Sequence, residues 1–294
     1  MKGFGYFINP VKRRPVLIVI LGIFMFLYCY IEYSFIMPIV FGLSVLKTGN
    51  IFDSVIHLIQ IVLNYIPNIN PAIFVYILLG IVAASLIAGL LLSGSLNVLN
   101  SALVNSDKEK GAFAKGIQKH YLKVSRITFL SIIYLILFTI FIVVVSVPAI
   151  VITSAAITEK PELMSVAYVL DFITVLILFF CIMFFKIYIF FWYPAAINYD
   201  KQPFARGKRA ADNSFWRILL KFLWYDILIF VFQMGLFYIN NILSRNESVV
   251  AEFTGIVVLL FLNWIFKTVI LISIISYVFS KFLSYWNRSR TVEN

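Results

Sequence analysis

The stretch from Ile127 to Ile152 reads ITFLSIIYLILFTIFIVVVSVPAIVI and contains no charged side chain. A helix rises about 1.5 Å per residue, so a helix of this length can cross a bilayer core about 30 Å thick. The apolar residues are continuous and do not alternate with a period of two, which excludes a strand of a membrane β-barrel. The stretch therefore predicts a transmembrane helix.

The rest of the chain has the same character. Of its 294 residues 62% are hydrophobic and 13% are charged, and its mean hydropathy is +0.99. A soluble domain averages about 45–50% apolar and about 25% charged residues, so a soluble protein is excluded. We expect an all-α, polytopic membrane helix bundle that forms one domain over residues 1–294. The six predicted spans are Val16–Met37, Ala72–Leu96, Ile127–Ile152, Val166–Tyr193, Ile218–Leu243 and Phe253–Phe279.

The basic residues predict the orientation of these spans. The net charge is +11, and 19 of the 24 Lys and Arg residues lie at the two termini or in the segments after the second and fourth spans. The opposite side carries only Lys47, Lys160 and Arg245. Because short cytoplasmic segments of membrane proteins are enriched in Lys and Arg, we expect both termini to be cytoplasmic.

Residues 51–66 have a different pattern from the spans. Asp53, His57, Gln60 and Asn64 form a polar stripe at helical spacing on an otherwise apolar segment. Such a stripe is typical of an amphipathic helix that lies in the membrane interface, here on the outer side.

The two basic segments resemble each other. Ala112-Phe113-Ala114-Lys115-Gly116 precedes Arg126-Ile127, and Pro203-Phe204-Ala205-Arg206-Gly207 precedes Arg217-Ile218, with a constant offset of 91 residues. The same offset carries the second span onto the fourth and the third onto the fifth. We therefore expect two parallel repeats, each a helix, a basic loop and a helix, over residues 72–152 and 163–243. The helices at 16–37 and 253–279 would flank them.

The basic loops are the first candidate site. Lys and Arg next to a membrane are attracted to an anionic leaflet by about 1 kcal/mol each, although such charges also set the topology. The candidate residues for binding lipid phosphates are Lys115, Lys119, Arg126, Arg206, Lys208, Arg209 and Arg217.

The ionisable residues inside the predicted spans are the second candidate site, because such residues are costly in a bilayer. They are Glu32, Asp171, Lys186, Asp226 and Lys267. From their depths, Lys186 and Asp226 can meet and neutralise each other, whereas Lys267 is expected to stand alone near mid-bilayer. Glu32 and Asp171 are expected near the outer face, where water is close. These residues form either a polar path between the repeats or structural pairs.

No catalytic motif accompanies these residues. The chain has no phosphate-binding glycine loop, no H-E-x-x-H motif and no cluster of Cys and His. Its two histidines, His57 and His120, are predicted on opposite sides of the membrane. We therefore expect no enzymatic activity, no cofactor and no metal site. The basic segments are short and tethered to the lipid surface, so we also expect no nucleic-acid partner.

The second basic segment resembles a known membrane family. Pro194-Ala195-Ala196-Ile197, Phe204-Ala205-Arg206-Gly207 and Phe215-Trp216-Arg217-Ile218-Leu219 are similar to a loop of prokaryotic six-helix membrane proteins. That group includes the YciC-like integral membrane proteins and the membrane domain of some glycerophosphodiester phosphodiesterases. The resemblance covers roughly residues 72–243. It implies a bacterial cytoplasmic membrane and no assigned catalysis.

Two functions remain open from the sequence. The first is a non-enzymatic membrane protein that binds anionic lipid, a membrane-protein partner or a second copy of itself through its basic loops. The second is a small transporter or an export- or immunity-type permease with a polar path near Asp226 and Lys267.

Overall fold

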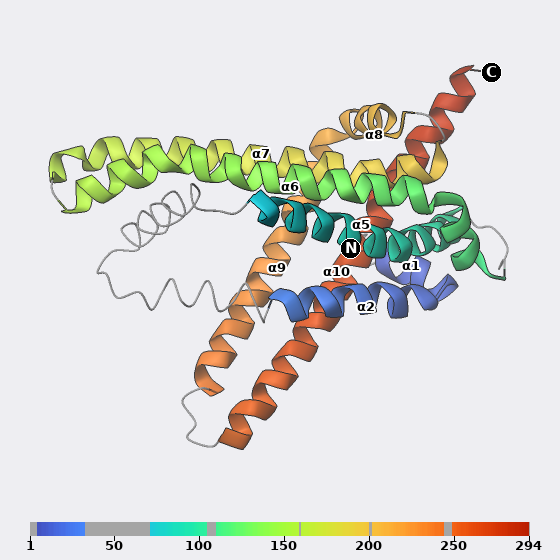
Figure 1. Ribbon diagram of the computed structural model, residues 1–294, viewed down its shortest axis with the longest axis horizontal. Coiled ribbons are helices and arrows are strands. Elements are labelled where there is room, and N and C mark those ends of the chain that lie inside the picture. The colour runs from blue at the N-terminus through green and yellow to red at the C-terminus, as the bar shows by residue number, and fades with distance from the viewer. Residues whose placement is uncertain are drawn as a thin grey trace. The chain divides into compact units, whose positions relative to one another are not determined.

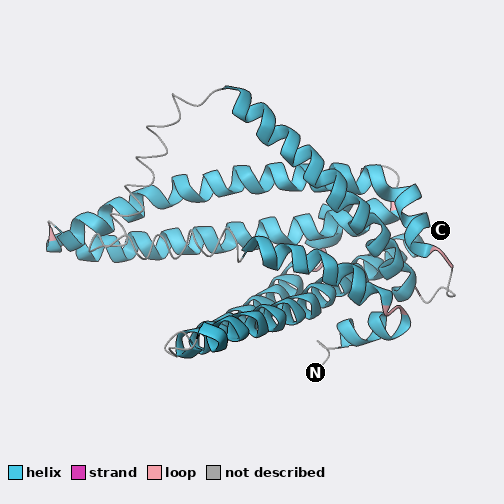
Figure 2. Ribbon diagram, turned by 60° about the horizontal axis from the view of Figure 1, so that its bottom comes forward, coloured by secondary structure: helices cyan, strands magenta, loops and turns pink. Residues whose placement is uncertain are grey.

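The computed structural model describes residues 5–32, 71–104, 110–158, 160–199, 202–243 and 249–293. Within these ranges the secondary structure is helical throughout, with no strand (Figure 2). The α-helices, labelled in Figure 1, are α1 (Gly5–Arg13), α2 (Val16–Ile31), α5 (Pro71–Leu103), α6 (Ala112–Thr158), α7 (Met164–Asn198), α8 (Pro203–Asp212), α9 (Phe215–Leu243) and α10 (Val249–Glu293). A 3₁₀ turn, η3 (Pro161–Leu163), precedes α7. The predicted interfacial helix at 51–66 lies outside the described residues.

Five of these helices are long and apolar enough to cross a membrane, namely α5, α6, α7, α9 and α10. A sixth span is present if α1 and α2, which are bent by 117° relative to each other, count as one. The predicted class of an all-helical, multi-pass membrane protein is confirmed at this level.

Several helices continue beyond the predicted spans. α6 has 47 residues and α10 has 45. The first basic segment, residues 112–126, is the start of α6 and is not a loop. The prediction of a loop was wrong because charged residues mark the end of an apolar span but do not end a helix. Lys, Gln and Ala are good helix formers, so α6 includes both the charged segment and the apolar span.

The chain divides into two compact units, which are described separately. Unit one contains residues 1–31, 88–127 and 186–294, and unit two contains residues 32–87 and 128–185. The helices α5, α6 and α7 each contribute residues to both units.

Unit one is built around α10, which contacts α1, α2, α8 and α9. Phe279 and Phe282 of α10 are fully buried. α2 buries side chains at a spacing of four residues, and the indole nitrogen of Trp264 donates a hydrogen bond of 2.7 Å to the Gly22 carbonyl. The residues that α2 buries are Leu17, Leu21, Gly22, Met25 and Cys29. The helix predicted at 253–279 as a flanking element is therefore the main packing partner in this unit.

Unit two contains the C-terminal part of α6 and the N-terminal part of α7, which run antiparallel and lie side by side in Figures 1 and 2. Phe138 stacks on Phe185 with ring centres 4.6 Å apart. Many large apolar side chains of these helices are exposed, among them Phe172, at 69%. An apolar surface of this extent fits contact with lipid tails and is unfavourable in water.

Candidate functional site

The second basic segment forms the short amphipathic helix α8. Gly207, Ala210 and Ala211 are buried, at the spacing that places small residues on one helix face. Arg206, Lys208 and Arg209 are exposed. The small residues allow α8 to pack closely on its neighbours, and the packing leaves the three cationic groups on the outside. This separation creates a basic helix face.

The first basic segment, at the start of α6, has the same division of residues. Its buried residues recur at helical spacing: Ala112, Gly116, His120, Val124 and Ile127. Lys115, Lys119 and Arg126 are exposed, as is Arg217 at the start of α9. The structure therefore exposes all seven residues that the sequence predicts as phosphate ligands. We call the exposed groups of Lys115, Lys119, Arg126, Arg206, Lys208, Arg209 and Arg217 the basic surface.

One glycine in each segment permits a close approach to the preceding helix. A Cβ atom on Gly116 would lie 2.9 Å from the carbonyl oxygen of Ser93 on α5. A Cβ atom on Gly207 would lie 2.9 Å from the carbonyl oxygen of Phe191 on α7. Both distances are shorter than real Cβ contacts, so any other residue would push the helices apart. Each basic segment is thus held against the helix that precedes it in the chain.

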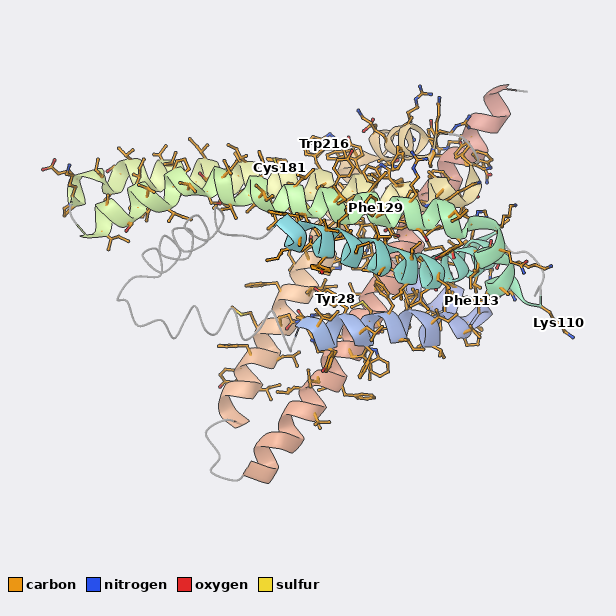
Figure 3. All side chains as sticks on the ribbon, viewed as in Figure 1. Tyr28, Lys110, Phe113, Phe129, Cys181 and Trp216 are labelled. Atoms are coloured by element: carbon orange, nitrogen blue, oxygen red, sulfur yellow. The ribbon has the colours of Figure 1, made fainter. Side chains whose placement is uncertain are left out.

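One phenylalanine in each segment reinforces this packing. The Phe113 ring lies against Gly94 of α5, where it occupies the space that a Cβ atom would need. The Phe204 ring meets Trp192 of α7 edge to face, with ring centres 5.0 Å apart. Figure 3 shows Phe113 at the start of α6, close to Lys110.

The contact points on the preceding helices do not follow the predicted offset. Ser93 and Phe191 are 98 residues apart, and so are Gly94 and Trp192. The basic segments themselves are 91 residues apart. The prediction that one offset of 91 relates α5 to α7 is therefore wrong for these contacts. Four of these seven residues lie in the connection, which has eight residues between α5 and α6 and four between α7 and α8. The other three belong to α5, which continues three residues further beyond its contact point than α7 does.

An aromatic stack connects the basic surface to α10. The Arg206 guanidinium lies 4.0 Å from the centre of the Tyr199 ring, within the range of a cation–π interaction. Tyr199 in turn meets Trp286 of α10 edge to face, with ring centres 4.1 Å apart. These contacts hold the Arg206 guanidinium over Tyr199 and, through Tyr199, connect α8 to α10.

The structure pairs two of the ionisable residues within the predicted spans. Lys186 of α7 forms an ion pair with Asp226 of α9, which confirms the predicted meeting of these residues. Their side chains are 24% and 30% exposed. The Lys186 ammonium also lies 5.5 Å from the centre of the Phe222 ring. These contacts make the two charges a structural pair within unit one.

The other ionisable residues have different surroundings. The Thr153 hydroxyl donates to the Asp171 carboxylate at 3.0 Å, so this carboxylate has a protein partner in unit two. Glu32 is partly buried at the end of the first described range. Lys267 is only 7% exposed, and its ammonium lies 5.5 Å from the centre of the Tyr28 ring of α2. The expectation that Lys267 stands alone was wrong, because the position of an aromatic ring on another helix cannot be predicted from residue spacing along α10.

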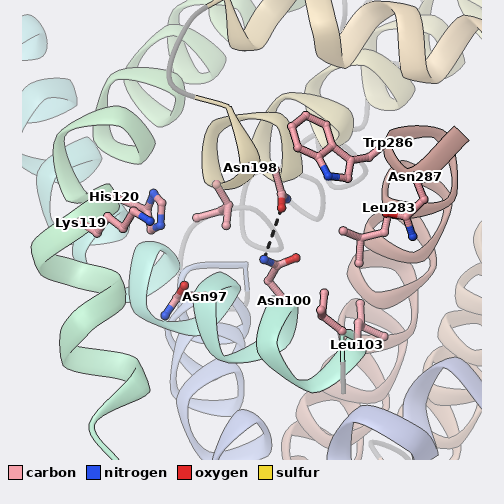
Figure 4. Close-up of a pocket in the computed structure, with 11 residues that line it drawn as sticks. Asn97, Asn100, Leu103, Lys119, His120, Asn198, Leu283, Trp286 and Asn287 are labelled. Atoms are coloured by element: carbon pink, nitrogen blue, oxygen red, sulfur yellow. Dashed lines mark hydrogen bonds between the residues drawn. The ribbon is translucent and has the colours of Figure 1, made fainter. Parts of the chain in front are cut away.

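A cavity of about 630 Å³ lies within unit one, near the basic surface. Polar side chains from α5, α6, α7 and α10 lie around it (Figure 4). Asn97 and Asn100 come from α5, Lys119 and His120 from α6, Ile197 and Asn198 from α7, and Leu283, Trp286 and Asn287 from α10, with Leu103 and Val104 completing the lining.

The sequence analysis missed this cavity. Of its lining residues only Lys119 was a candidate ligand. The remaining signal, three asparagines near the ends of α5 and α7, is weak because asparagine is also common at helix ends. Within the described ranges, no cluster of three or more His, Cys, Asp or Glu side chains could hold a metal ion.

These features define a class of protein: a multi-pass, all-helical membrane protein with a basic surface and a polar cavity at the same helix ends. Comparison with protein-family models, with curated proteins and with solved structures finds no match.

Proposed function

We propose that this chain is a non-enzymatic protein of a bacterial cytoplasmic membrane that binds anionic lipid headgroups through its basic surface. The observation that carries this proposal is the shared construction of the two segments. In each segment, a glycine lies close to a backbone carbonyl of the preceding helix. A phenylalanine of the same segment packs against the next residue of that preceding helix. Cationic groups held outward in this way suit phosphate oxygens at a bilayer surface.

The same construction supports an internal duplication. Buried positions of α5 and α7 correspond at an offset of 98, as for Ser93 with Phe191 and Leu99 with Ile197. Asn100 and Asn198 are also 98 residues apart, and the Asn100 amide donates to the Asn198 oxygen at 3.4 Å. Contact between equivalent residues is expected at a pseudo-two-fold axis. We therefore infer two repeats, the first of which has seven more residues between its contact point on the preceding helix and its basic segment.

The proposed orientation follows from the basic surface. If it faces an anionic leaflet, both termini and the polar cavity lie on the cytoplasmic side, in agreement with the positive-inside rule. A membrane-protein partner or a second copy of the chain remains a prediction of the sequence.

The structure favours a transporter or permease less. Asp226 is paired with Lys186, and Lys267 lies by Tyr28, so the two residues predicted to line one path have separate partners. Pairing two opposite charges within the protein reduces the free-energy cost of placing either charge in a membrane span, which is a structural role.

The proposal predicts that the triple variant Arg206→Gln/Lys208→Gln/Arg209→Gln binds anionic lipid at least tenfold more weakly. Each juxtamembrane charge contributes about 1 kcal/mol, so three together contribute about 3 kcal/mol. Native mass spectrometry of the full chain, titrated with phosphatidylglycerol in mild detergent, measures the change. The corresponding α6 variant, Lys115→Gln/Lys119→Gln/Arg126→Gln, should lose a similar amount.

The matched control is Arg206→Lys/Lys208→Arg/Arg209→Lys, which changes the same three residues and keeps their charges. It should bind phosphatidylglycerol within about threefold of the wild type, since the attraction is mainly electrostatic. If both neutralised variants retain wild-type binding, the proposed function is wrong.

A further inference from the structure

The polar cavity of unit one has the hydrogen-bonding groups of a ligand site, and it shares only Lys119 with the basic surface. Its volume of about 630 Å³ falls within the range of about 300–1,000 Å³ that is usual for small-molecule pockets. Four asparagine amides, one lysine and one histidine line it, together with apolar side chains and Trp286. None of these described lining residues is a carboxylate. The cavity therefore favours a ligand with a negative charge.

The internal hydrogen bonds determine how the amides are oriented. The Asn198 Nδ2 donates to the Pro194 carbonyl at 2.8 Å, so the Asn198 oxygen must face the other way. This oxygen accepts the bond from Asn100 Nδ2 at 3.4 Å. The Asn97 Nδ2 donates to the Ala112 carbonyl at 2.8 Å. An amide nitrogen carries two hydrogens, so each of these three asparagines keeps one N–H beyond the bonds described.

One acceptor remains unused in this arrangement. The Oδ1 atom of Asn100 is buried and has no hydrogen-bond partner among the residues that the structure describes. It cannot exchange places with Nδ2, because the nitrogen is needed to donate to the Asn198 oxygen. A buried acceptor without a donor is unfavourable, and a ligand that supplies an O–H group would relieve this cost.

We propose that the cavity binds a phosphate monoester. Its charged oxygens would accept from the remaining amide N–H groups and from Lys119, and its one protonated oxygen would donate to Asn100 Oδ1. A phosphate monoester has a second pKa near 6, so it carries such a proton at mildly acidic pH, whereas a sulfate ester carries none. The cavity is larger than a phosphate group alone, and Leu103, Leu283 and Trp286 provide walls for the organic part.

The first experiment measures ligand choice by isothermal titration of the full chain in mild detergent at pH 5.5, where a phosphate monoester with a second pKa near 6 is mostly singly protonated. The probes are phenyl phosphate and phenyl sulfate, which share the organic group and a tetrahedral anion. Phenyl phosphate should bind at least tenfold more tightly, because only it can donate to Asn100 Oδ1. Equal binding of the two probes, or no binding of phenyl phosphate at millimolar concentration, would overturn the proposal.

The second experiment locates the site. Asn100→Leu keeps the approximate volume but removes both the donor and the acceptor, and it should abolish phenyl phosphate binding. Lys119 is exposed, so Lys119→Gln is a variant that should still fold, and it should weaken binding about tenfold. The control Asn213→Leu changes an exposed asparagine after α8 and should bind as the wild type does. Wild-type affinity in Asn100→Leu and Lys119→Gln would contradict the site.

The third experiment identifies the source of the phosphate monoester. In nanodiscs, phosphatidic acid presents this group as a lipid headgroup, and it should displace phenyl phosphate if the cavity opens to the bilayer. If phosphatidic acid does not compete, the ligand is a soluble phosphate ester; both results support the cavity as a phosphate site. The variant Arg206→Gln/Lys208→Gln/Arg209→Gln should leave phenyl phosphate binding unchanged, so failure of the basic surface and failure of the cavity are distinguishable.

Discussion

Asp226→Leu should destabilise the protein by about 2–3 kcal/mol, and the double variant Lys186→Met/Asp226→Leu should regain most of this loss. The single substitution leaves the Lys186 ammonium without its carboxylate within α7, one of the candidate membrane spans. An unpaired charge in a span costs about 2.5–3.5 kcal/mol, and removing one partner of a pair is more harmful than removing both. The partial exposure of both side chains places the expected loss toward the low end of that range.

Thermal unfolding of the four chains of this double-mutant cycle, all in the same detergent, measures the coupling between the two residues. Lys208→Met is a suitable control, since it removes an exposed lysine from the basic surface and should change the unfolding temperature little. Additive losses, with the double variant less stable than either single variant, would show that Lys186 and Asp226 act independently and would argue against a structural pair.

Gly89→Leu should lower stability by about 2–3 kcal/mol, whereas Gly80→Leu on the same helix should not. A Cβ atom on Gly89 would lie 2.7 Å from the Cα atom of Ser125 on α6, so a side chain there must separate the two helices. Overpacking of this kind costs about 1–3 kcal/mol, and here the obstacle is backbone that cannot rotate away. Nothing lies within 4 Å of a Cβ atom on Gly80.

The comparison of these two glycine variants measures helix packing directly. Leucine is a better helix former than glycine by up to about 1 kcal/mol, so Gly80→Leu is expected to be neutral or slightly stabilising. The unfolding temperatures of both variants, measured in the same detergent, provide the test. A loss of equal size at Gly80 and Gly89 would mean that α5 and α6 do not approach each other at Ser125.

The helices were predictable because a single physical rule governs them: about 20 consecutive apolar residues form a span. The same rule misjudged where the helices end, because α6 includes the charged residues of 112–126 as well as the apolar span. Small residues at a spacing of four, Gly80, Ala84 and Ala88, are the pattern of a close-packing face on α5. In the structure Gly80 and Ala84 are exposed, and the close approach to α6 is made at Gly89.

The candidate sites were predictable to different degrees. The pairing of Lys186 with Asp226 could be predicted because the depth of a residue in a span follows from its distance along the helix from the end of the span. The two residues lie at similar depths. The contact of Lys267 with Tyr28 and the cavity around Asn100 and Asn198 depend on how distant segments meet, which depth does not reveal. The seven-residue difference between the two proposed repeats could not be predicted for the same reason, since only contacts indicate which residues of α5 and α7 would correspond.

The most direct test of the basic surface uses a phosphatidylglycerol with a photoreactive headgroup in bilayers that contain the full chain. Mass spectrometry of the cross-linked peptides then reports where the headgroup lies, and a photoreactive phosphatidylcholine of the same acyl chains provides the reference. We expect phosphatidylglycerol to be enriched over phosphatidylcholine on peptides from residues 112–126 and 203–217. An equal distribution of the two lipids over these peptides, or enrichment at the opposite end around Lys160, would contradict the account.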